Sequence, residues 1–151
     1  MTPVERLAAR VLVVDPDGAV LLFRGRDPSR PEGSEFWFTP GGGVEGDESL
    51  LVAARRELFE ETGLEIDVVG APVFERTTEF DFEDARIRQT EHFFVVRAER
   101  FRVDESNWTE LERRFMLEHR WWTAEEIAAS SDEIHPANLA ALVDDVVEST
   151  R

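Results

Sequence analysis

The sequence predicts an α/β domain, because strand-like segments stand on both sides of a central helix and a second amphipathic helix lies near the C-terminus. The strand-like segments are short runs rich in Val, Leu, Ile and Phe, bounded by Gly, Pro or Asp. Both helices carry apolar residues at helical spacing on one side. The 151 residues suffice for one substantial core and not for two ordinary ones, so we expect a single domain over residues 1–151.

The first third of the chain predicts a β-hairpin, a loop and a short strand. Residues 4–14 end in an apolar run, and after the turn Asp15–Gly18 the chain returns as a second strand over Ala19–Phe23. Residues 27–35, rich in Pro, Ser, Glu and Gly, are typical of a mobile loop. Phe36–Phe38 then predicts a short strand, in which core packing is the expected use of at least two of the three aromatic side chains.

The central helix is expected to begin near Asp47–Ser49, with acidic residues in its first turn, where the helix dipole favours them. It is expected to end at Thr62–Gly63, because glycine readily takes the left-handed conformation of a helix C-cap. Leu51, Ala54 and Leu58 share one side of this helix. We expect that side to anchor the helix to the core.

The second half of the chain predicts further strands and two C-terminal helices. The expected elements are, in chain order, strands over Ile66–Val69 and Val73–Phe80, a hairpin connection over Glu79–Asp84, strands over Glu91–Val96 and Phe115–Trp122, a short helix through Ala129, and a final helix from about Pro136 to Glu148. Thr123 and Glu126 form the capping-box pattern that begins the short helix. In the final helix, the residues expected to face inward share one side: Leu139, Leu142, Val143 and Val146.

Composition and charge exclude several classes of protein. The chain has 33 acidic and 17 basic residues and a net charge of −16, which opposes unspecific attraction to nucleic acid or anionic membranes. All basic residues are arginine, which binds phosphate in a bidentate manner, and no lysine is present for Schiff-base chemistry. The absence of cysteine excludes disulfides, thiolate catalysis and zinc-thiolate sites. With no membrane-length apolar run and no signal-peptide core, we expect a soluble, cytoplasmic protein.

Three glutamates on the central helix predict a cation site. Glu57, Glu60 and Glu61 stand at i, i+3 and i+4 and therefore share one face. Like charges this close repel one another, and a hard divalent cation with oxygen ligands, Mg²⁺ or Mn²⁺, would relieve that repulsion. A solvated acidic face is the ordinary alternative, and the pattern around the glutamates argues against it.

That pattern runs from Gly42 to Leu64 and matches G-x5-E-x7-R-E-U-x-E-E-x-G-U, where U is apolar. The chain therefore resembles the Nudix hydrolase superfamily and its MutT-like members, of which this box is the signature. Every fixed position is filled: Gly42, Glu48, Arg56, Glu57, Leu58, Glu60, Glu61, Gly63 and Leu64. The resemblance implies the Nudix α/β/α sandwich, with a mixed β-sheet between helices, and a metal-dependent hydrolase.

The resemblance also implies roles within and beside the box. The carboxylates of Glu57, Glu60 and Glu61 would bind the metal, together with the backbone carbonyl of Gly41. Arg56 would pair with a neighbouring carboxylate and orient it. These assignments make Mg²⁺ or Mn²⁺ the expected cofactor.

The identity of the general base is left open by the sequence. Glu57 is one candidate, and the acidic region Glu110–Glu118 is the other, with Glu112 as first choice and Glu118 as second. Most other acidic residues near there are expected to lie in a solvated loop. Glu48 is expected to have a structural role, and Glu91 either reaches the metal site or faces solvent.

Five residues outside the box are candidates for substrate contact: Arg24, Arg26, Trp37, Phe80 and Arg88. The arginines suit phosphate binding, although a solvated strand end is an equally good interpretation of Arg24 and Arg26. Trp37 is a candidate for stacking on a base or sugar, with core packing as its alternative. Phe80 would replace a stacking tyrosine, since the chain has none.

The expected reaction is attack of water on a phosphorus atom of a diphosphate linkage, in a nucleoside diphosphate joined to another moiety. Substrates of this kind are nucleotides, ADP-ribose or nucleotide sugars, and dinucleoside polyphosphates. The partner is thus a small nucleotide-type molecule, with no polymeric nucleic acid and no membrane, and a homodimer is compatible with the sequence. The alternative function is a non-catalytic Nudix nucleotide sensor, which would be expected to have lost carboxylates of the box. An isopentenyl-diphosphate isomerase is rejected because the chain has no cysteine.

Overall fold

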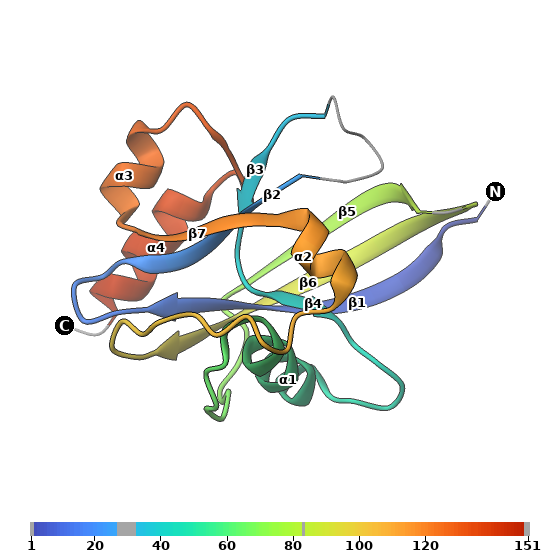
Figure 1. Cartoon of the computed structure of the whole chain (residues 1–151), viewed down its shortest axis with the longest axis horizontal. Coiled ribbons are helices and arrows are strands. Elements are labelled where there is room, and N and C mark those ends of the chain that lie inside the picture. Colours follow the sequence, from blue (N-terminus) through green and yellow to red (C-terminus); the bar gives the residue numbers. More distant parts are fainter. Residues whose placement is uncertain (1, 27–32, 83, 150–151) are drawn as a thin grey trace.

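The computed structural model describes residues 2–26, 33–82 and 84–149, which form one mixed β-sheet with helices on both faces (Figure 1). The strands are β1 (Val4–Val14), β2 (Val20–Gly25), β3 (Phe36–Phe38), β4 (Gly41–Gly43), β5 (Phe74–Phe82), β6 (Ala85–Arg97), β7 (Met116–Trp122) and β8 (Glu133–Ile134). The helices are α1 (Leu50–Thr62), α2 (Glu110–Phe115), α3 (Ala124–Ala129) and α4 (Leu139–Glu148). The predicted α/β/α sandwich with a mixed sheet is confirmed.

The sheet is built around β1. Its neighbours give the order β5-β6-β1-β2-β3-β8, with β4 also paired to β1 and β7 to β2. β1 runs parallel to β6 along its whole length, from Val4 opposite Ile87 to Val14 opposite Arg97. The predicted hairpin joins β1 to β2 through Val14 and Val20, after which the two strands diverge and β4 takes the place beside β1.

The alternating side chains of β1 belong to two separate cores. Val11 and Val13 pack with the apolar side of α1 on one face of the sheet, whereas Leu12 and Val14 pack with α4 on the other. All four are buried, which explains why this strand reads as a continuous apolar run instead of an alternating one. Figure 1 shows α1 on one side of the sheet and α3 and α4 on the other.

The central helix begins within the predicted range, with Ser49 as its N-cap, and ends at the predicted C-cap, Gly63. The Ser49 side chain accepts a hydrogen bond from the Val52 backbone N–H at 3.2 Å, and Gly63 has the left-handed φ of 80° and donates its N–H to the Phe59 carbonyl. The expectation of acidic residues in the first turn was wrong, because Asp47 and Glu48 precede the N-cap. The segment before the cap is instead closed by a hydrogen bond from the Glu45 N–H to the Glu48 carboxylate.

Two predicted segments differ from the structure, and most of a third lies outside the residues that it describes. Ile66–Val69 is not a strand: this segment crosses the α1 side of the sheet and buries Val68, while Val69 is exposed. The expected connection Glu79–Asp84 is shorter than predicted, since β5 continues to Phe82 and β6 starts at Ala85. Most of the expected mobile loop, residues 27–32, lies outside the described residues.

Three short elements were not predicted. β4 consists of glycines, which carry none of the side chains by which strands are recognised. α2 occupies the region expected to be an acidic loop, and β8 adds two residues next to β3. The other predicted strands and both C-terminal helices are confirmed to within a few residues, including the capping box of Thr123 and Glu126. No helix in the described ranges combines the length and the apolar character that crossing a membrane requires.

Candidate active site

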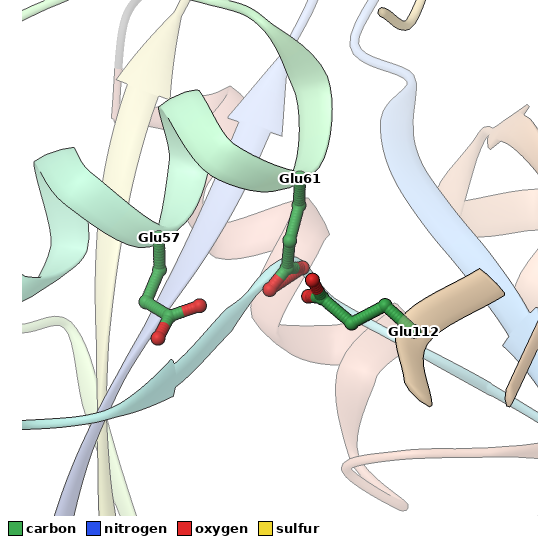
Figure 2. Close-up of side chains that lie close together, drawn as sticks. All are labelled: Glu57, Glu61 and Glu112. Atoms are coloured by element: carbon green, nitrogen blue, oxygen red, sulfur yellow. The ribbon is translucent and has the colours of Figure 1, made fainter. Parts of the chain in front are cut away.

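Three glutamates from two helices converge beside the glycine strand β4. Glu57 and Glu61 project from successive turns of α1, and Glu112 projects toward them from α2 (Figure 2). One carboxylate oxygen from each lies within 4.8 Å of the other two. We call Glu57, Glu61 and Glu112 the glutamate cluster. Its two α1 members face the same way because they are four residues apart on a helix.

Local contacts of α2 explain how Glu112 reaches this cluster. Thr109 caps α2 in a capping box: its backbone N–H donates to Glu112 Oε1 at 2.9 Å, and its hydroxyl accepts from the Glu112 N–H. Trp108, one residue earlier, donates its indole N–H to the backbone carbonyl of Glu61 at 2.7 Å. The start of α2 is therefore fastened to the end of α1.

Burial makes the negative charge of this cluster costly. Glu61 is only 2% exposed, and burial, followed by the charge of Glu57, raises its pKa well above the usual value; Arg10 opposes this only partly. Burial also raises the pKa of Glu57, against the opposing charge of Arg56. Without a cation, these carboxylates are stabilised by protonation. Buried, converging carboxylate oxygens of this kind fit a hard divalent ion such as Mg²⁺ or Mn²⁺.

Arg56 connects the loop before α1 to the glutamates of the helix. Its Nε and Nη2 donate to the two carboxylate oxygens of Glu48 at 2.7 and 2.8 Å, and its Nη1 donates to Glu57 at 3.0 Å. Its Nη2 also donates to the Gly43 carbonyl at 3.1 Å. The Arg56 guanidinium lowers the pKa of Glu48 to about 2, so Glu48 is ionised and serves as the anchor of Arg56. Glu60 accepts a hydrogen bond from Arg56 Nη1 at 3.3 Å, and its side chain is 40% exposed. Its carboxylate is not one of the three that form the glutamate cluster.

Gly41 and Gly42 of β4 are needed because β1 and α1, respectively, lie very close to this strand. A Cβ atom on Gly42 would lie 2.6 Å from the Glu57 carboxyl carbon. A Cβ on Gly41 would lie 2.2 Å from the Ala9 carbonyl oxygen, and the φ of Gly41, +142°, is one that other residues rarely adopt. The Gly41 N–H donates to Glu61 Oε1 at 3.2 Å, which holds that carboxylate against β4.

A buried carboxylate, Glu91, lies near the cluster with two arginine partners that the sequence did not reveal. Glu91 on β6 is 2% exposed, so the solvent-facing interpretation of this residue was wrong. It accepts from Arg10 Nε at 2.8 Å and from Arg76 Nε at 2.7 Å. Burial raises the pKa of Glu91, but Arg10 and Arg76 outweigh that effect and keep the pKa below its usual value. The only sequence signal was an arginine within the apolar run of β1, because the contacts depend on the parallel register of β1 and β6.

The three arginines proposed for substrate contact do not reach the glutamate cluster. Arg24 is ion-paired with Glu35 and, at 3.1 Å, with Glu118. Arg88 is paired with Glu5 at 3.1 Å on the parallel β1–β6 pair. Arg26 is exposed at the end of β2, where its backbone N–H donates to the carbonyl of Phe115.

The two aromatic candidates lie in different surroundings. Trp37 is 3% exposed and packs edge-on against Trp122, with ring centroids 5.0 Å apart, in the core shared with α4. Its indole N–H donates to Asp132 at 3.2 Å. Trp37 is therefore on the face of the sheet opposite to α1, in the core-packing role that was its alternative. Phe80 is half-buried on strand β5, opposite Ile87.

Comparison with known proteins places these features in a family. The model of the NUDIX domain matches residues 4–143. An uncharacterized Nudix hydrolase, YfcD of Escherichia coli K12, is 35% identical over 141 residues, which cover 89% of this chain and 68% of that protein. An RNA pyrophosphohydrolase of Caulobacter vibrioides is 45% identical over 62 residues, 41% of this chain and 34% of that protein. The crystal structure of a MutT protein from Methanosarcina mazei superposes with a TM-score of 0.70 at 22% identity, covering 100% of this chain and 99% of the other.

Proposed function

The chain belongs to the Nudix hydrolase family, and from this premise we propose that it is a Mg²⁺- or Mn²⁺-dependent pyrophosphohydrolase. Its proposed substrate is a small molecule in which a nucleoside diphosphate is linked to another moiety: a nucleotide, ADP-ribose or a nucleotide sugar, or a dinucleoside polyphosphate. The observation that carries the proposal is the convergence of Glu57, Glu61 and Glu112 within 4.8 Å, two of them with pKa values raised by burial. Such carboxylates are suited to bind a divalent ion and to exchange a proton with water.

The glutamate cluster is the proposed ion site. Glu60, one turn from Glu57 on the same helix, and the Gly41 carbonyl complete the proposed set of oxygen donors. The chemistry supplied by a bound ion of this kind is neutralisation of phosphate oxygens and acidification of a water molecule. Arg56 orients Glu57 through a 3.0 Å hydrogen bond and is itself fixed by Glu48.

The proposed general base is Glu57 or Glu112. A carboxylate whose pKa is raised by burial, as that of Glu57 is, accepts a proton more readily near neutral pH. Glu112 is favoured over Glu118 because its carboxylate joins the cluster, whereas that of Glu118 is paired with Arg24. Either base would take a proton from the attacking water as the phosphorus–oxygen bond of the leaving group breaks.

The relatives support diphosphate cleavage without fixing the substrate. The similarity to the RNA pyrophosphohydrolase covers 41% of this chain, so it bears on the shared chemistry and not on RNA as a substrate. The net charge of −16 favours a small molecule over a nucleic acid polymer. We therefore propose a single cytoplasmic domain that acts on free nucleotides.

The test is a hydrolysis assay that separates and quantifies the phosphorylated products of nucleoside triphosphates, ADP-ribose, nucleotide sugars and dinucleoside polyphosphates, with Mg²⁺, with Mn²⁺ and with EDTA. We expect metal-dependent turnover of at least one substrate, and a loss of kcat on the order of a hundredfold or more in Glu61→Gln. Glu125→Gln, an exposed change on α3, is the matched control and should behave as wild type. Absence of turnover across the panel, or a fully active Glu61→Gln protein, contradicts the proposal.

A further inference from the structure

The two arginines that hold Glu91 are both available for a further partner. Arg10 uses its Nε for Glu91 and its Nη1 for the carbonyls of Thr39 and Gly41, both at 3.2 Å. Arg76 uses its Nε for Glu91 and its Nη1 for His135 Nδ1, at 3.4 Å. Within the described part of the chain, neither Nη2 has a hydrogen-bond acceptor, and neither is among the buried polar atoms that lack a partner. Each arginine thus presents a free N–H edge to solvent.

The charges in this group do not cancel. Glu91 requires one positive charge for neutralisation when buried, and it has two guanidinium partners with side chains 19% and 24% exposed. Glu91, Arg10 and Arg76 together therefore carry one surplus positive charge in a chain whose net charge is −16, and part of that charge acts on Glu61 of the glutamate cluster. An anion that approached the glutamate cluster would be repelled by most of the molecule and attracted here.

Arg10, the first of the two arginines, also lies close to the glutamate cluster. Arg10 Nη1 and Glu61 Oε1 bind the carbonyl oxygen and the N–H of the same residue, Gly41, at 3.2 Å each. Arg76 is held from its other side by His135, which in turn contacts Glu133 at 2.7 Å through Nε2. Both guanidinium groups are consequently fixed before any ligand arrives, which reduces the conformational entropy lost on binding.

We propose that Arg10 and Arg76, held in place by Glu91, form a phosphate-binding subsite beside the glutamate cluster. This inference rests on the proposed function, because the ligand assigned to the two arginines is the phosphate group of the diphosphate substrate that is not bound at the glutamate cluster. The two free Nη2 edges donate hydrogen bonds to phosphate oxygens, and Glu91 is the positioning residue for both arginines. Arg24 and Arg88 are less suited, because each of them is paired with two carboxylates and so contributes no surplus positive charge.

The test is calorimetric binding of inorganic pyrophosphate in EDTA, which measures the subsite independently of metal and of turnover. We expect wild type to bind, and Arg76→Gln to bind about tenfold or more weakly, the loss expected for a charge-assisted pair with phosphate. Arg76→Lys keeps the charge and loses the fork, so it should fall between the two. Arg86→Gln, which removes an exposed arginine paired with Asp81, is the matched control and should bind as wild type.

A second measurement separates this proposal from a structural role of Arg76. On a substrate identified in the panel, Arg76→Gln should raise KM by a similar factor and leave kcat within about threefold, since it removes a binding contact and not the reacting groups. Thermal unfolding verifies that each variant is folded. If Arg76→Gln does not fold, the comparison is made between wild type and Arg76→Lys. No pyrophosphate binding by wild type, or equal binding by the folded variants, overturns the subsite even if hydrolysis is observed. Weakened binding without any hydrolysis retains the subsite and rejects the proposed function.

Discussion

Replacing Glu61 by glutamine should make the metal-free protein more stable. The substitution removes one of the two negative charges that α1 directs at the same point, and it preserves the shape of the side chain. The amide oxygen of glutamine can still accept the hydrogen bond that Gly41 N–H donates to Glu61 Oε1 at 3.2 Å. The stability change therefore reports mainly the charge.

The magnitude follows from the distance between the carboxylates. Two unit charges 4.8 Å apart repel one another by about 3 kcal/mol at an effective dielectric constant of roughly 20. Arg10 and Arg56 offset part of this repulsion, and the burial penalty of the Glu61 charge adds to it. A stabilisation of about 1–3 kcal/mol is expected, which raises the Tm of a domain of this size by roughly 3–10 °C.

The effect should depend on pH in a defined direction. The pKa values of Glu57 and Glu61 are raised in the folded protein, mainly by burial, so between about pH 4.5 and those raised values the folded state binds more protons than the unfolded state. The metal-free wild type must therefore lose stability as pH rises through this window. Glu61→Gln removes the larger contribution, so its advantage should be greatest near neutral pH and small near about pH 4.

Thermal unfolding in EDTA measures the stability of the metal-free protein, and thermal unfolding in Mg²⁺ measures the stability gained when the ion binds. Mg²⁺ at a hundred times its Kd should stabilise the wild type by about 2.7 kcal/mol and the variant by much less, because the variant lacks a ligand charge. Glu65→Gln, beyond the end of α1 with a side chain 74% exposed, should change neither value. If Glu61→Gln is less stable than wild type in EDTA near neutral pH, the reasoning about buried charge is refuted.

Three further changes test other parts of the site. Gly42→Ala places a Cβ 2.6 Å from the Glu57 carboxyl carbon, so it should lower kcat about a hundredfold while the far-ultraviolet circular dichroism spectrum stays unchanged. Glu48→Gln should lower the stability measured by urea unfolding at about pH 6. Because Arg56 lowers the pKa of Glu48 in the folded protein, the difference in stability should shrink as pH falls from about 4.5 toward 2. A difference that grows on acidification would contradict the role of Glu48 as the ionised partner of Arg56. Trp37→Phe should cost about 1–3 kcal/mol of stability without changing KM, whereas a raised KM would restore its role in substrate contact.

The parts of the fold that the sequence predicted well are those coded by neighbouring residues. The caps of α1 at Ser49 and Gly63 and the capping box at Thr123 depend on hydrogen bonds that span only a few residues. The inward side of α4 follows from helical periodicity alone, and Leu139 and Val143 are indeed buried. Helix ends and buried helix faces of this kind can be predicted without knowing what the helix packs against.

The contacts that were missed depend on long-range register. Arg10, Arg76 and Glu91 come from three different strands, and nothing within a short window links them. β4 was invisible because its glycines are selected by the space between β1 and α1, which exists only in the folded sheet. Trp37 and Arg24 were candidates because their residue types suit ligand contact. Only the fold shows that Trp37 packs against Trp122 and that Arg24 is paired with Glu118.

The parallel pairing of β1 with β6 also constrains when the protein can fold. β1 is the first strand of the chain, yet its partner along its whole length, from Val4 opposite Ile87 to Val14 opposite Arg97, is made much later in synthesis. Sheets that depend on such distant pairings form slowly, since the chain must close a long loop before the contacts repay its entropy. During translation, α1 leaves the ribosome together with β1 and β4 but before β6, and a fragment that ends ahead of β6 would keep the glutamate-bearing helix without the strand that pairs with β1 along its whole length.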